Sequence, residues 1–133
     1  MLRQLLITAD PIDEASLLAT RKMSQDMGAV VCFLGVVRQI EGDALVEALE
    51  YESFRAMAEH QFNLLFDQVE KRWPVESVRL VHRLGRVRVN EPSLWVEVVA
   101  AHRGEAFQAC QWLIDQMKQV VPIWKRPLKA GGR

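Results

Sequence analysis

Apolar residues recur at helical spacing in three stretches of the chain, and each stretch predicts a helix. The two longer stretches, residues 55–73 and 104–120, are each followed by a proline that would end a helix. A shorter stretch, residues 12–25, has Asp10 as a candidate N-cap and stops before Gly28. The residues expected to face inward are Met57, Ala58, Phe62, Leu65, Phe66 and Val69 in the first long helix, and Phe107, Cys110, Leu113, Ile114 and Met117 in the second.

The apolar runs between these helices are shorter and predict strands. Residues 29–37 are nearly all apolar and rich in valine, which is typical of a strand buried on both faces. Residues 44–53 alternate between apolar and polar positions, and residues 39–43 before them are expected to form a loop. Further strand-like runs cover residues 2–8, 75–83, 87–89 and 93–101. Because the connections are short, this order favours an α+β fold with a mainly antiparallel sheet and two to three helices.

Length and composition narrow the possible classes of protein. A chain of 133 residues is expected to form a single domain, 1–133, and its 50% hydrophobic content argues against disorder. The 17 basic residues balance the 17 acidic ones, which argues against a nucleic-acid partner. No signal peptide and no apolar run long enough for a membrane span is recognisable, so we expect a cytoplasmic protein without a membrane partner.

The two cysteines are expected to be inert. Cys32 and Cys110 both lie within apolar runs, where a buried thiol is the usual finding. They form no metal-binding pattern with the histidines, so no metal is expected. His60 and His82 lie in a predicted helix and a predicted strand, and structural roles are favoured for both.

The neutral total conceals a basic C-terminal quarter. From His102 onwards there are six basic residues against the two acids Glu105 and Asp115. His102 and Arg103 stand where a strand passes into a helix, and oriented amides at a helix start favour an anion. Lys118 and Lys125 are separated by the break at Pro122, so both ammonium groups can face one site and act as acid, base or nucleophile.

Arg38 supplies a third cationic site, because it follows the glycine at the end of the apolar run 29–37. Three strand or helix ends that each carry a cation suggest a single anionic ligand. The alternative is that these residues are solvated, or are ordinary partners of the helix dipole.

Five blocks of the sequence, in order, carry a family resemblance. They are GAVVCFLGVVR (28–38), LEYESFRAMAE (49–59), RWPVESVRLVHRLGRV (72–87), AAHRGEAFQAC (100–110) and IDQMKQVVPIWKR (114–126). With these blocks the chain resembles the MoaE family, the catalytic (large) subunits of molybdopterin synthase.

The resemblance implies an α/β hammerhead fold and a sulfurtransferase of molybdenum cofactor biosynthesis. Such an enzyme converts cyclic pyranopterin monophosphate (precursor Z) into molybdopterin by inserting two sulfurs as a dithiolene. The sulfur arrives as a thiocarboxylate on the C-terminal Gly-Gly of a small ubiquitin-like subunit. The resemblance further implies a homodimer of large subunits within a heterotetramer, and no cofactor or metal.

Residue by residue, the resemblance implies catalytic roles for Lys118 and Lys125. These lysines would share a substrate pocket, formed across the dimer, with Val36, Val37, Arg38, His102, Arg103 and Arg126. Phe33 and Met117 would line a tunnel for the tail of the partner. Many members have an acidic residue where this chain has Pro127. An alternative of a different class is a non-catalytic paralogue that binds the ubiquitin-like tail or a phosphorylated pterin.

Overall fold

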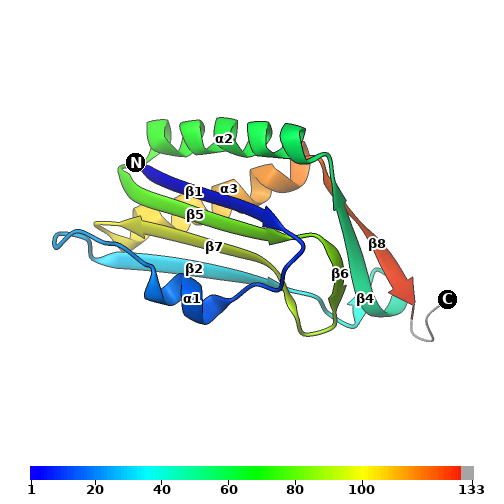
Figure 1. Ribbon diagram of the computed structural model, residues 1–133. Helices are drawn as coiled ribbons and strands as arrows, with labels where there is room; N and C mark the ends of the chain where they lie inside the picture. The colour runs from blue at the N-terminus through cyan, green and yellow to red at the C-terminus, as the bar shows by residue number, and fades with distance from the viewer. Residues whose placement is uncertain (130–133) are drawn as a thin grey trace.

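The computed structural model describes residues 1–129, so the C-terminal segment 130–133, expected to be a frayed tail, lies outside the described residues. Figure 1 shows the arrangement of the helices and strands. In chain order they are β1 (Leu2–Thr8), α1 (Glu14–Ala19), β2 (Ala29–Val36), β3 (Ile40–Glu41), β4 (Ala44–Ser53), α2 (Arg55–Arg72), β5 (Val75–Arg83), β6 (Gly85–Arg88), β7 (Pro92–Ala100), α3 (Arg103–Val120) and β8 (Ile123–Lys129). The fold is α+β, as the sequence predicts.

The larger sheet has the strand order β1-β5-β7-β2. β7 is antiparallel to both of its neighbours, whereas β1 runs parallel to β5. α2 lies over β1 and β5, and α3 lies over β7 and β2 (Figure 1). The two long helices therefore cover one face of this sheet side by side.

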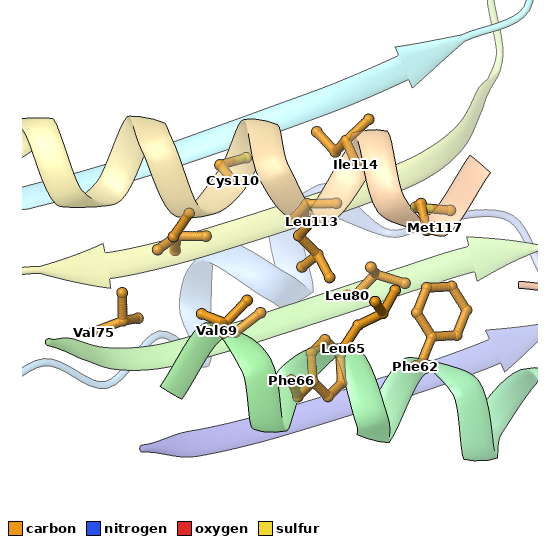
Figure 2. Close-up of a cluster of buried hydrophobic side chains, with 14 of the residues drawn as sticks. Phe62, Leu65, Phe66, Val69, Val75, Leu80, Cys110, Leu113, Ile114 and Met117 are labelled. Carbon is orange, nitrogen blue, oxygen red and sulfur yellow. The ribbon is translucent and has the colours of Figure 1, made fainter. Parts of the chain in front are cut away.

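The main hydrophobic core fills the space between these helices and the sheet. Figure 2 shows Phe62 and Phe66 of α2 and Leu113 of α3 pointing toward Leu80 of β5. All four side chains are fully buried, and the two phenylalanine rings stack with centroids 6.3 Å apart. Each such side chain contributes on the order of 2 kcal/mol through burial alone, so this layer fixes the sheet against which the site is built.

The second sheet is smaller and is organised around β4. β6 and β8 pair with opposite edges of β4, and β3 forms a short hairpin with its first residues. A register shift between Val46 and Ala48 bends β4. Figure 1 shows β4 and β8 running steeply away from the end of the larger sheet. The two sheets consequently enclose a corner.

The face of the larger sheet opposite the long helices carries a buried ion-pair network. Glu97 of β7 is 1% exposed and receives hydrogen bonds from Arg79 and Arg21 at 2.6–3.0 Å. Burial raises the pKa of Glu97, but the two guanidinium groups outweigh it and lower the pKa overall. Arg79 also donates to the Leu17 carbonyl and the Thr20 hydroxyl. The network thereby ties α1 and the turn after it to the sheet.

Several expectations about elements and burial are wrong. The helix expected over 12–25 spans only Glu14–Ala19, and its N-cap is Asp13, whose carboxylate accepts from the Ser16 amide. The strand expected over 29–37 spans Ala29–Val36 and is not buried on both faces, because β2 is an edge strand and none of its residues is fully buried. Cys32 on it is consequently exposed, whereas Cys110 is buried as expected.

Two smaller expectations also fail. Met57 and Phe107 lie at the margins of the inward faces of α2 and α3 and are more than half exposed. The strands β3 and β8 were not expected.

Within residues 1–129, no helix is both long enough and apolar enough to cross a membrane.

Candidate functional site

A cavity of about 650 Å³ lies in the corner between the two sheets. The larger sheet supplies the ends of β2, β5 and β7, and the smaller sheet supplies residues of β3 and β4 and the start of β8. The last turn of α3 closes a further side. Segments far apart in the sequence therefore meet here, and each contributes the end of a rigid element.

Three cations predicted from the sequence line this cavity. Arg38 follows β2, Lys118 lies on the last turn of α3, and Lys125 lies on β8. The Lys125 ammonium forms an ion pair with Glu41 at 2.8 Å. Neither Arg38 nor Lys118 forms an ion pair with any residue in the described part of the chain. The cavity thus offers two uncompensated positive charges and one that is already neutralised.

One wall of the cavity is apolar. It contains Phe33, Val36, Val37 and Met117, all four of which the family resemblance assigned to the substrate pocket or to the tail tunnel. Gly35 lies between them, and a Cβ there would come within 3.2 Å of the Phe33 ring and 3.3 Å of the Leu94 Cβ. The missing side chain therefore allows Phe33 to pack closely over the strand.

A polar group of side chains lines another part of the cavity. The Tyr51 hydroxyl donates to Ser93 Oγ at 3.3 Å, and the Ser93 hydroxyl donates weakly to the Gly35 carbonyl at 3.5 Å. The Tyr51 ring meets His82 edge-on, with ring centroids 5.2 Å apart. Sequence reasoning did not assign Tyr51, Ser93 or Glu41 to the site. The alternation of β4 could have pointed to Tyr51 because it marks which side chains share a face.

His82 is buried, as expected for a structural histidine, and it also lines the cavity. Its Nδ1 lies 2.8 Å from the Arg83 carbonyl, which can only accept, so Nδ1 carries the proton. Burial lowers the pKa of His82, and the hydrogen bond to Arg83 opposes this only in part. At neutral pH the ring is therefore uncharged, and Nε2 is its free acceptor.

The structure does not bring His102 and Arg103 to the cavity. They stand at the start of α3, and Lys118 stands at its end. The fifteen residues from Arg103 to Lys118 correspond to about 22 Å along an α-helix. The His102 side chain is 81% exposed, with Nδ1 3.8 Å from Glu105. Within one chain these two residues are separate from the lysines.

Arg126 is adjacent to Lys125 but is not among the residues that line the cavity. Successive side chains of a strand point to opposite faces. Lys125 is in register with Tyr51, whereas Arg126 is in register with Glu50 and binds its carboxylate at 2.5 Å. Lys125 therefore faces the cavity, whereas Arg126 lies on the opposite face of the smaller sheet.

The family model for the MoaE protein matches residues 7–120 of the chain. The chain belongs to the MoaE family. A molybdopterin synthase catalytic subunit from Thermoplasma volcanium is 39% identical over 123 residues, which is 92% of this chain and 87% of that protein. Molybdopterin synthase from Staphylococcus aureus has a similar structure, with a TM-score of 0.88, 30% identity and coverage of 99% of this chain and 96% of that one.

A more distant MoaE-like fold occurs in a complex of subunits 1 and 2 of the molybdopterin-converting factor from Helicobacter pylori. The TM-score is 0.74 at 21% identity, with coverage of 98% of this chain and 86% of that one. This likeness concerns the fold alone. Among residues 1–129, no group of three or more side chains is placed to hold a metal ion.

Proposed function

We propose that this chain is the catalytic subunit of a molybdopterin synthase, which converts cyclic pyranopterin monophosphate into molybdopterin by inserting two sulfurs as a dithiolene. Membership of the MoaE family supports this activity. The observation that carries it is the convergence of Arg38, Lys118 and Lys125 on one cavity with an apolar wall. A phosphorylated pterin needs cations for its phosphate and an apolar surface for its ring system.

The sulfur donor in this proposal is the C-terminal thiocarboxylate of a small ubiquitin-like subunit. A Gly-Gly tail has no side chains, so it fits a narrow passage between apolar residues. Phe33 and Met117 line the cavity and are suited to flank such a passage. The two-subunit complex of the Helicobacter pylori factor supports a small-subunit partner for this fold.

The two lysines have different roles in the proposed reaction. One ammonium holds the thiocarboxylate and stabilises the negative charge that develops as sulfur attacks the pterin side chain. The other donates or accepts a proton while oxygen leaves, and water then hydrolyses the thioester that has formed, so that the sulfur stays on the pterin and the tail is released as a carboxylate. No cofactor or metal enters the proposed sulfur transfer.

A second copy of the chain supplies the remaining cations. His102 and Arg103 are exposed and lie about one helix length from Lys118, so a site that contains all of them requires two chains. In a homodimer, the start of α3 of one protomer would face the cavity of the other. With one small subunit at each outer end, the assembly would be a heterotetramer.

The decisive experiment is reconstitution with a thiocarboxylated small subunit and precursor Z, in which formation of the dithiolene product is followed in a single turnover. We expect product in proportion to the thiocarboxylate supplied. Binding of the tail without any product would contradict the proposal and favour a non-catalytic module.

A further inference from the structure

The ion pair between Glu41 and Lys125 is the least expected feature of the cavity. The Lys125 ammonium lies 2.8 Å from Glu41 Oε1, and both residues line the cavity. The Glu41 side chain is 24% exposed and the Lys125 side chain is 47% exposed, so both remain accessible to a ligand. A carboxylate here opposes the binding of an anion, which is the ligand that the other cations favour.

The geometry of β4 makes this contact unusual. On β4, Glu41 is in register with Ala44 and Lys125 with Tyr51, seven residues further along. Seven residues of a straight strand span about 23 Å, which two side chains cannot bridge. The bend of β4 between Val46 and Ala48 brings the two together. The ion pair therefore holds the β3–β4 hairpin over the cavity.

This hairpin is weakly attached to the rest of the sheet. β3 has only two residues, and one further backbone hydrogen bond joins the Val46 amide to the Gln39 carbonyl at 2.8 Å. Its turn contains Gly42 at φ 61°, a conformation that glycine adopts without strain. Segments with few backbone hydrogen bonds open at low free-energy cost. Glu41 can therefore leave Lys125 without disturbing β4 or β8.

We propose that Glu41 competes with anionic ligands for Lys125 and so sets the affinity of this cavity for them: its carboxylate binds the Lys125 ammonium in the ligand-free chain and is replaced by an anionic group of the ligand. This inference rests on the proposed function, in which that group is a phosphate or a thiocarboxylate. A neutral ligand leaves the ion pair intact, because it offers Lys125 no charge in exchange. An anion that also reaches Lys118 and Arg38 replaces Glu41 with a net gain in binding free energy.

The test is calorimetric binding of three probes: inorganic pyrophosphate, a short peptide ending in Gly-Gly with a free carboxylate, and the same peptide amidated. In the Glu41→Gln variant, we expect at least one of the two anionic probes to bind about three- to fivefold more tightly, the order of what a partly exposed ion pair contributes. The affinity for the amidated peptide should not change. The anionic probe that gains affinity identifies the group, phosphate or carboxylate, that replaces Glu41 at Lys125.

Asp43→Asn is the matched control, because Asp43 lies in the same hairpin, is exposed and does not line the cavity. It removes the same charge and should leave all affinities unchanged. A second control places Glu41→Gln in a Lys125→Met background, where the gain should disappear. An equal gain there, or in Asp43→Asn, would show general repulsion and overturn the exchange.

The two proposals fail in different ways. Weaker or unchanged anion binding by Glu41→Gln, in a chain that melts at the wild-type temperature, contradicts the inference about Glu41 alone. A wild-type chain that binds neither anionic probe contradicts the proposed function together with this inference.

Discussion

At the scale of single residues, the cations of the cavity differ in what neutralises them. Lys125 is paired with Glu41, whereas Lys118 has no acidic partner in the described part of the chain. An unpaired ammonium is ready to bind an incoming anion without first releasing a carboxylate. Of the two lysines, Lys118 is therefore the one whose loss should affect catalysis more.

We predict that Lys118→Ala reduces molybdopterin formation by at least about a hundredfold, the range typical of a group that stabilises developing charge. The measurement is single-turnover product formation from precursor Z and thiocarboxylated small subunit. Lys22→Ala is the control, because Lys22 is exposed and does not line the cavity. Wild-type turnover by Lys118→Ala would remove this lysine from the mechanism.

His82 is the residue that links the cavity to the stability of the fold. Burial lowers the pKa of His82 in the folded chain. As the pH falls, the unfolded chain therefore binds a proton at His82 before the folded chain does. The contribution of neutral His82 to stability is therefore fully present above the unfolded pKa of about 6.5 and is lost as the pH falls below it.

We predict that the free energy of unfolding of the wild-type chain decreases as the pH falls from about 7 toward 5, and that His82→Phe flattens this decrease. Urea unfolding at a series of pH values measures it. His60→Gln serves as the control, since His60 is exposed and should leave the slope unchanged. The same slope in the wild type and in His82→Phe would mean that another group is responsible.

At the scale of elements, α1 depends on the sheet for its position. It has six residues, none of them buried, so its own packing contributes little. Its attachment passes through Arg79, which connects the Leu17 carbonyl to Glu97. The strength of this attachment consequently depends on a single buried carboxylate.

We predict that Glu97→Gln lowers the free energy of unfolding by about 3 kcal/mol, because it leaves the buried Arg79 charge without a counter-ion. Chemical denaturation measures this change. Glu47→Gln is the matched control: its ion pair with Arg86, at 2.7 Å, is largely exposed. That variant should cost less than about 1 kcal/mol. Equal losses in the two variants would contradict the structural role of Glu97.

The elements that the sequence predicts well are those with a strong period and a clear stop. α2 and α3 lie within one residue of their expected bounds, because each has a continuous apolar stripe and a proline after it. β8 escapes prediction because it carries two adjacent cations and Pro127, which only an edge strand tolerates. The helix expected over 12–25 ends at Ala19, and Arg21 just beyond it pairs with Glu97, a tertiary contact that no local pattern reveals.

At the scale of the whole molecule, the length of α3 decides how the site can be assembled. Lys118 and Arg103 lie at its two ends, so a single chain cannot use both on one ligand. In the proposed homodimer, two chains related by a two-fold axis could do so, because each would offer the start of α3 to the cavity of the other.

We predict complementation between two inactive variants, Lys118→Ala and Arg103→Ala. When the two are unfolded together, refolded and mixed with the small subunit, random pairing gives one intact site in each mixed dimer, and about a quarter of wild-type activity should return. Each variant treated alone is the control. No recovery in the mixture, with dimers present, would mean that Arg103 does not act across the interface.

The cavity itself is predictable from the sequence only in part. Arg38, Lys118 and Lys125 were expected to share one site, and all three line the cavity. Glu41 was missed because a two-residue strand leaves no periodic signal, and its contact depends on the bend in β4. The orientation of Arg126 was missed for a related reason: alternation could be applied to it only once β8 was known to be a strand.

The parallel pairing of β1 with β5 has a consequence for the order in which the chain can fold. Leu2 is in register with Ser77, and Thr8 with Arg83, so β1 has no partner until synthesis has passed α2 and reached β5. Its inward-facing residues, among them Leu5 and Ile7, lack their packing partners during that time. Closure of the larger sheet on this side is therefore a late, long-range step of the kind that slows folding.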